Sequence, residues 1–265
     1  MREAPLRVVQ ITDTHLFANP EKDLLGVKTH ESLQKLINLL NQKQVNPDLI
    51  LLTGDLSQDQ SAESYQHLAE MIKPLQVPAY CIPGNHDDSD VMYEVFPKYN
   101  IAIERYIILK KWQIILLDSQ KPDAVEGYLA PAQFKFLQKN LQQSPNHHTL
   151  LALHHHPVSV ETTWLDNIGL QNAEAFWDAL KDFTHVRAVL FGHVHSLHEG
   201  KKNGIQYFST PSTCIQFKPR QAKFSLDKLP PAYRIIDLYA NGTVKTEVHR
   251  LDHYVGVFEQ DARGY

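Results

Sequence analysis

Residues 7–15 read RVVQITDTH, a short apolar strand that runs directly into Asp13 and His15. The same arrangement, an apolar run followed by Asp, Asn or His, recurs at LILLTGD (49–55), AYCIPGNHD (79–87), TLLALHHHP (149–157) and AVLFGHVH (188–195). Parallel sheets hold their ligands beyond the carboxyl ends of the strands. If the five strands lie in one sheet, we therefore expect the five polar clusters to meet at one edge of it.

Helical patterns alternate with these strands. Apolar residues spaced three and four apart predict helices over 29–41, 61–72, 130–140 and 172–180. Further strands are expected at 106–109, 112–117, 205–208, 234–238 and 243–248, the last two joined by a turn at Asn241-Gly242. This alternation predicts a largely α/β core.

The composition excludes several classes of protein. The chain has 265 residues, of which 43% are hydrophobic and 21% charged, as in ordinary globular proteins. Its formal net charge of −4 argues against gripping long nucleic acid, although a bound metal would still allow a small phosphate ligand. We find neither an apolar run of the about 18 residues that a membrane helix needs nor a secretory signal. The two cysteines, Cys81 and Cys214, make no disulfide framework, so we expect a cytoplasmic protein with no membrane partner.

Histidine is unusually frequent, with 15 His against 11 Gly. Asp, Asn and His together suit divalent metals. Residues i and i+2 of an extended segment point the same way, so we expect Asp13 and His15 to reach one ion and His193 and His195 to do the same. One carboxylate between two ions can bridge them, and two metals about 3.5–4 Å apart clamp a phosphate and activate a water.

The five clusters, in their order along the chain, resemble the five sequence blocks of the calcineurin-like metallophosphoesterases. The blocks are Asp13-x-His15, Gly54-Asp55, Gly84-Asn85-His86-Asp87, the His154 segment and Gly192-His193-x-His195. A closer resemblance, to the bacterial class III 3′,5′-cyclic AMP phosphodiesterases, extends over essentially the whole chain. It rests on GDLSQDQS at 54–61, LDSQ at 117–120, HHHP at 154–157 and STPSTCIQFKP at 209–219.

The resemblance implies a fold and an activity. The expected fold is the α/β metallophosphoesterase sandwich, α-β-β-α, with two packed mixed β-sheets flanked by helices. Residues 1–265 would form one metallophosphoesterase domain, with 205–265 as a C-terminal strand and loop extension packed on the core. The expected activity is hydrolysis of 3′,5′-cyclic AMP to 5′-AMP by in-line attack of a hydroxide that bridges two metals.

Site roles also follow from the resemblance. The implied metal ligands are Asp13, His15, Asp55, Asn85, His154, His193 and His195. Asp13, His15, Asp55 and His195 would hold the first ion, and Asp55, Asn85, His154 and His193 the second. The implied catalytic residues are Asp55, Asn85 and His86, and the implied substrate-binding residues are His15, Asp55, Asn85 and His86. His86 would either stabilise developing charge or protonate the leaving oxygen, and Asp87 would orient that imidazole or a metal-bound one.

The resemblance implies a metal cofactor and a small-molecule partner without fixing which metal is bound. Relatives commonly use iron or manganese, while the same donor set also accepts cobalt or zinc. The expected partner is a small cyclic nucleotide rather than long nucleic acid, and because many relatives form dimers, a homodimer is also considered.

Three alternatives stay open on the sequence alone. The same chemistry could act on a 2′,3′-cyclic nucleotide, a glycerophosphodiester or a small phosphomonoester. A protein of this fold can also serve as an inactive scaffold, although here all the ligand candidates are present. Nuclease action on long DNA or RNA is disfavoured by the net charge of −4 and the lack of a basic arm.

For several further residues, both a functional and an ordinary structural role are considered. We expect surface or ordinary polar roles for His30, His67, His147, His148, His185, His198, His249 and His253. His155 and His156 either line the site or support its ligands. Cys81 is expected in the core, and the role of Cys214 is open. The segment 210–220, with Phe217, Lys218 and Arg220, would hold substrate or a neighbouring subunit, or form an exposed loop.

Overall fold

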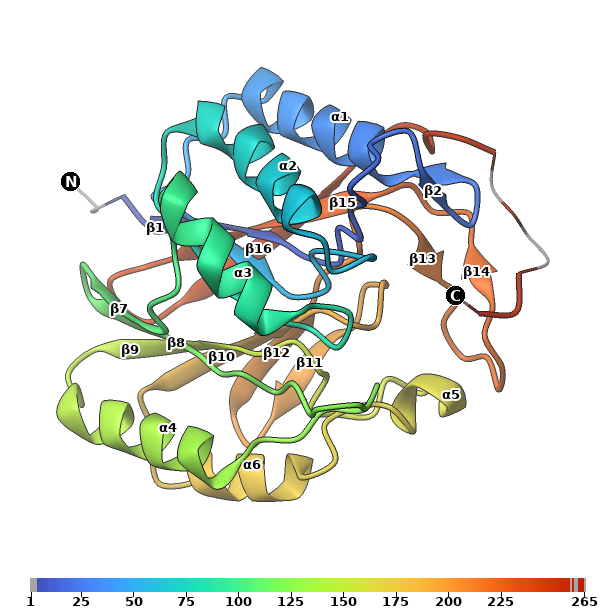
Figure 1. Cartoon of the computed structure of the whole chain (residues 1–265). Coiled ribbons are helices and arrows are strands. Elements are labelled where there is room, and N and C mark those ends of the chain that lie inside the picture. The colour runs from blue at the N-terminus through green and yellow to red at the C-terminus, as the bar shows by residue number, and fades with distance from the viewer. Residues whose placement is uncertain (1–3, 258, 260–261, 265) are drawn as a thin grey trace.

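Two six-stranded sheets form the centre of the computed structural model, which describes residues 4–257, 259 and 262–264 (Figure 1). The first sheet has the order β16-β15-β1-β4-β5-β6. Its strands are β1 (Leu6–Ile11), β4 (Leu49–Thr53), β5 (Ala79–Ile82), β6 (Ile101–Ala102), β15 (Ala232–Leu238) and β16 (Val244–Arg250). β1, β4, β5 and β6 are parallel, whereas β15 runs antiparallel to both β1 and β16.

The second sheet also has six strands, four of which are parallel. Its order is β11-β12-β10-β9-β8-β7, with four parallel strands inside and one antiparallel strand at each edge. The strands are β7 (Tyr106–Leu109), β8 (Trp112–Leu116), β9 (His148–Ala152), β10 (Val186–Phe191), β11 (Glu199–Lys202) and β12 (Ile205–Ser209). β11 was not predicted, because its sequence EGKK has no apolar pattern. Lysines are common in edge strands, where they prevent pairing with another chain.

Helices cover the outer face of each sheet. In Figure 1, α1 (Thr29–Gln42), α2 (Ala62–Ile72) and α3 (Ser89–Val95) lie over the first sheet, and α4 (Pro131–Gln143) and α6 (Ala173–Leu180) lie over the second. This is the expected α-β-β-α sandwich. The sequence patterns did not predict α3. Its first turn is capped by the side chain of Asp88, which accepts the amides of Asp90 and Val91.

Three apolar clusters fill the spaces between these layers. Val8, Leu51 and Leu190 belong to the cluster between the two sheets, whereas Val9 on the opposite face of β1 packs against the helices. Because β4 and β9 are buried on both faces, their sequences are continuous apolar runs rather than alternating ones. Cys81 is fully buried, as predicted.

Shorter elements extend from one end of the sandwich. They are β2 (Asp23–Leu24), β3 (Val27–Lys28), α5 (Thr163–Asp166), β13 (Gln216–Phe217) and β14 (Leu226–Asp227) (Figure 1). Single turns of 3-10 helix, Lys73–Leu75 and Phe96–Tyr99, directly follow α2 and α3. In the part of the chain that the structure describes, no helix has the length and apolar character to cross a bilayer.

The C-terminal part of the chain contributes strands to both sheets. β12 pairs with β10 in the second sheet, and β15 pairs with β1 in the first. That residues 1–265 form a single domain stays a prediction.

Candidate metal centre

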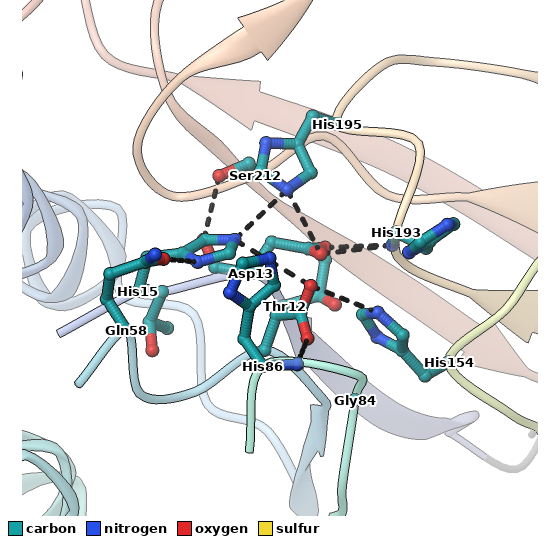
Figure 2. A network of polar contacts seen from close by, with 12 residues as sticks. Thr12, Asp13, His15, Gln58, Gly84, His86, His154, His193, His195 and Ser212 are labelled. Carbon is teal, nitrogen blue, oxygen red and sulfur yellow. Dashed lines mark hydrogen bonds and ion pairs between the residues drawn. The ribbon is translucent and has the colours of Figure 1, made fainter. Parts of the chain in front are cut away.

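The five polar clusters meet at one end of the sandwich, but they come from two sheets. The clusters after β1, β4 and β5 belong to the first sheet, and those after β9 and β10 belong to the second. The condition under which convergence was expected, five strands in one sheet, is therefore not met, but the clusters still converge, and the two sheets are those that the resemblance implies. The amide of His193 donates to Asp13 Oδ1 at 3.0 Å, which joins the two sheets at the site (Figure 2).

The backbone of the ligand candidates is not extended. Asp13, His15, Asp55, His193 and His195 all have positive φ angles, of 54°, 45°, 51°, 68° and 44°. A left-handed backbone costs a residue other than glycine about 1–3 kcal/mol, and such strain concentrates at functional sites. The prediction that an extended i, i+2 arrangement aims these side chains is therefore wrong, because sharp left-handed turns aim them instead.

A first group of donors is formed by Asp13, His15, Asp55 and His195, whose ligand atoms all lie within 4.8 Å of one another. His195 Nε2 lies 3.2 Å from Asp13 Oδ1 and 3.2 Å from His15 Nε2. His15 Nε2 in turn lies 3.8 Å from Asp55 Oδ2. All four residues are buried, so the two carboxylates and two imidazoles face one another rather than solvent.

The outer nitrogens of three imidazoles are held by oxygen acceptors. His15 Nδ1 lies 2.6 Å from Gln58 Oε1, His154 Nδ1 lies 2.9 Å from the Thr53 carbonyl, and His195 Nδ1 lies 3.0 Å from the Ile215 carbonyl. An oxygen acceptor requires a proton on Nδ1, which leaves the lone pair of each neutral ring on Nε2. The Nε2 atoms of His15 and His195 would then oppose lone pair to lone pair. The arrangement is favourable when a cation lies between them, so these residues fit a metal.

A second group of donors adjoins the first through Asp55. His154 Nε2 lies 3.2 Å from Asp55 Oδ2. Asn85 Oδ1 and His193 Nε2 are buried and have no hydrogen-bond partner among the described residues. Buried polar atoms normally have a partner, and a second cation would supply one here.

Charge and burial act against each other in this group. Burial alone would lower the pKa of the His154 imidazole, but the Asp55 carboxylate raises it to about 9. Burial would likewise raise the pKa of Asp55, yet His154 and His86 hold it well below the usual range. Without a metal, a proton on His154 thus compensates the negative charge of Asp55. A bound cation would replace that proton as the positive charge beside the carboxylate.

His155 is unsuited to be a ligand even though it lies beside His154 and His193. Its Nδ1 lies 2.8 Å from Ser119 Oγ and its Nε2 lies 3.1 Å from the Val125 carbonyl, so both ring nitrogens are engaged. His156 stacks on His193 at 5.6 Å between ring centroids, with 21° between the planes. Both residues therefore pack against the imidazoles of candidate ligands, His155 against His154 and His193 and His156 against His193.

Cys214 contacts the site through its thiol. Its Sγ lies 3.4 Å from the Asp13 carbonyl, close to His15 and His195. Burial raises the pKa of the thiol to about 12. A protonated thiol is a poor nucleophile, so Cys214 does not supply the attacking group. Its Sγ nevertheless lies in one donor cluster with the imidazoles of His15 and His195.

The loop that carries Asn85 and His86 is fixed from several sides. The His86 amide donates to Asp55 Oδ1 at 2.8 Å, and its ring lies edge-on to that of His15, with 5.0 Å between centroids. Asp87 accepts the amides of Gly84 at 2.8 Å and Leu56 at 2.9 Å, and so joins the β4 and β5 loops. These bonds, rather than an imidazole contact, account for the position of the Asp87 side chain.

Sequence reasoning missed two glutamines that position the site. Gln58 holds His15, and Gln120 Nε2 donates to the carbonyls of Gly84 at 3.0 Å and Asp87 at 2.6 Å. Both residues lie inside quoted motifs, GDLSQDQS and LDSQ, so the signal was present without an assigned role.

We expect Gln58→Ala to weaken metal binding by about 10- to 100-fold, because the partner of a ligand histidine fixes its tautomer and ring orientation. Titration of the metal-free protein with Mn²⁺ would measure the dissociation constants. Gln42→Ala, at an exposed position in the last turn of α1, is the matched control and should bind as the wild type does. Equal affinity in both variants would show that Gln58 does not orient a ligand.

A cavity of about 360 Å³ opens onto the metal centre. Asp55, Asn85, His86 and His193 line one side of it. This volume lies at the lower end of the range typical of small-molecule sites, about 300–1,000 Å³. A larger hollow of about 530 Å³ lies over β15 and β16 and contains none of the motif residues, so it has no part in this chemistry.

The sequence matches the family model for calcineurin-like phosphoesterases over residues 6–197, which include all five clusters. The chain belongs to this family. As a calcineurin-like phosphoesterase it is similar to the 3′,5′-cyclic adenosine monophosphate phosphodiesterase CpdA of Escherichia coli K12, with 45% identity over 94% of this chain and 91% of the relative. The CpdA of Vibrio vulnificus is 43% identical over 95% of this chain and 92% of the relative.

Solved structures agree on the fold of this phosphoesterase. A dimetal phosphatase from Danio rerio superposes with a TM-score of 0.63 at 14% identity, covering 94% of this chain and 99% of that one. At so low an identity the likeness concerns the sandwich architecture alone.

Proposed function

We propose that this protein is a metal-dependent phosphodiesterase that hydrolyses 3′,5′-cyclic AMP to 5′-AMP. One observation carries the reaction class: two donor groups share the buried Asp55 carboxylate at the wall of a cavity of small-molecule size. The substrate is supported by the likeness to the CpdA phosphodiesterases, which extends over nearly the full length of both chains.

Each donor group would hold one divalent cation. We assign Asp13, His15, Asp55 and His195 to the first and Asp55, Asn85, His154 and His193 to the second. When bound, two such cations supply Lewis-acid charge to the phosphate and lower the pKa of water. The protein contributes rigidity, because the hydrogen bonds behind His15, His154 and His195 hold the rings in place before the substrate arrives.

His86 is the residue that we place at the leaving group. Its side chain is only half-buried and lines the cavity, while its amide is tied to Asp55. In the reaction the oxygen of water forms a bond to phosphorus and gives up one proton to solvent, the bond from phosphorus to O3′ breaks, and O3′ takes up a proton. We propose that the His86 imidazole delivers that proton, while Asn85 and His15 help to hold the phosphate.

Iron and manganese are the metals that we propose, with cobalt or zinc as substitutes, and we further propose a cytoplasmic homodimer. Elemental analysis of the protein as isolated would identify the metals. Light scattering of the same sample would measure the oligomeric state.

The experiment that tests the activity is product analysis of Mn- or Fe-loaded protein with 3′,5′-cyclic AMP. We expect 5′-AMP to form, and to disappear with a chelator or in the Asn85→Ala variant. Asn41→Ala, at an exposed position on α1, is the control that should retain activity. Cleavage of 2′,3′-cyclic AMP alone would overturn the substrate, and no cleavage by fully loaded protein would overturn the enzymatic function.

A further inference from the structure

We infer that the nucleobase of the substrate stacks on Trp164 and Phe224, the two partly buried rings of an aromatic wall formed by Trp164, Phe217 and Phe224. The inference rests on the proposed function and concerns the side of the cavity that faces away from the metal centre. Val125, Trp164, Ile168, Phe217 and Phe224 line that side. The cavity is therefore divided between donors suited to a phosphate with its cations and rings suited to a flat, apolar group.

The three rings of the wall pack against one another. Trp164 lies 5.0 Å from Phe217 at 73° and 5.3 Å from Phe224 at 59°, measured between ring centroids. Phe217 and Phe224 are 5.4 Å apart at 65°. Such edge-to-face contacts stabilise aromatic clusters and hold each ring in one orientation.

Two loops that are far apart in the sequence build this wall. Trp164 lies on α5, in the loop after β9, whereas Phe217 and Phe224 belong to β13 and the loop that leads to β14; Figure 1 shows both loops at the same end of the molecule. The amide of Arg220 donates to Thr162 Oγ1 at 2.9 Å, which ties the second loop to the start of α5. This hydrogen bond connects the two loops that carry the wall. Within segment 210–220, residues 210–217 are buried and residues 218–220 are exposed.

The wall begins at the metal centre itself. Phe217 is 3% exposed and stacks on His195 with 4.2 Å between ring centroids and 10° between planes. Trp164 and Phe224 are only partly buried and carry the wall away from the metal centre. Phe217 therefore links the site of the phosphate to the site that we assign to the base.

The aromatic wall would contact the flat face of a base by stacking rather than the edge of the base by hydrogen bonds. Stacking strength grows with ring size and needs no particular hydrogen-bonding pattern. We therefore expect purine cyclic nucleotides to be preferred over pyrimidine ones, with little discrimination between adenine and guanine by this wall.

The kinetic test compares cyclic AMP with a substrate that lacks the base, methyl riboside 3′,5′-cyclic phosphate. In Trp164→Leu and Phe224→Leu we expect the ratio of kcat/KM for the two substrates to fall by about 5- to 150-fold, the size of one lost base-to-aromatic stack. Turnover of the base-free substrate should change less than about 2-fold, because the metal centre is untouched. Trp164→Phe keeps a stacking face and should restore much of the ratio.

A matched control and a binding measurement complete the test. Tyr128→Leu removes an exposed aromatic residue outside the cavity and should leave the ratio unchanged. Because Trp112 and Trp177 are 1% and 2% exposed, binding of 5′-AMP should quench the fluorescence of Trp164, and Trp164→Phe should lose that quenching.

The outcomes separate this inference from the proposed function. If the wild type hydrolyses both substrates with equal kcat/KM, or if both fall together in the variants, the wall does not bind the base although the enzyme assignment stands. If the wild type hydrolyses neither, the proposed function itself has failed.

Discussion

Asp55→Asn is expected to reduce kcat/KM for 3′,5′-cyclic AMP by at least about 10³-fold. Asp55 belongs to both proposed ligand sets, and its Oδ2 lies 3.2 Å from His154 Nε2 and 3.8 Å from His15 Nε2. Asparagine keeps the volume of the side chain but removes the charge that balances two cations. Because metal ions contribute several kcal/mol to such reactions and each 1.4 kcal/mol is a factor of ten, a loss of this size follows.

Metal content should fall together with activity in this variant. Elemental analysis should find fewer ions per chain than in the wild type, measured after the same loading and desalting. Asp237→Asn is the control, because Asp237 pairs with Arg7 at 2.8 Å far from the five clusters and should leave both quantities unchanged. An Asp55→Asn protein with full metal content and normal turnover would refute the assignment of Asp55.

His86→Gln is expected to lower kcat by about 10²- to 10⁴-fold for cyclic AMP while leaving metal content unchanged, since a general acid contributes about that much. The hydrogen bond from His86 to Asp55 comes from the backbone amide, so the substitution preserves that bond. Steady-state kinetics on metal-loaded protein would measure the effect.

The leaving group decides between the two roles considered for His86. The ribose O3′ needs a proton as it departs, whereas 4-nitrophenolate is stable without one. If His86 donates the proton, the variant should lose much less activity on 4-nitrophenyl phosphodiesters than on cyclic AMP. Equal losses on both substrates would instead assign His86 to charge stabilisation. His67→Gln, at a histidine whose Nδ1 contacts the Phe17 carbonyl, is the control and should lose nothing.

The class of fold and the residues of the site were accessible from sequence because they depend on local patterns. Apolar runs such as LILLT mark buried strands, and each ligand candidate follows such a run directly. Each cluster follows the carboxyl end of a parallel strand, where such sheets hold their ligands, but chain order does not tell that the edges of two sheets meet at one site. The structure brings together all seven ligand candidates and His86, although their roles as ligands and catalyst stay predictions.

The failures arose where the outcome depends on distant contacts. The left-handed backbone at Asp13 and His15 is unfavourable locally and is held by bonds to another loop, such as that from the Asp13 amide to the Gly54 carbonyl at 2.9 Å. The pairing of β12 with β10 and of β15 with β1 likewise has no signal in the C-terminal sequence itself.

By itself, then, the sequence determined the chemistry of the donor set and the order of most strands and helices along the chain, because both depend on local sequence patterns. Tertiary structure alone decided which of the five clusters each sheet supplies, and that Gln58 Oε1 contacts His15 Nδ1. It alone also brought Trp164 beside Phe217, residues separated along the chain by three strands of the second sheet. The physical reason is that ring stacking and hydrogen bonds act over a few ångströms in space, whatever the distance along the chain.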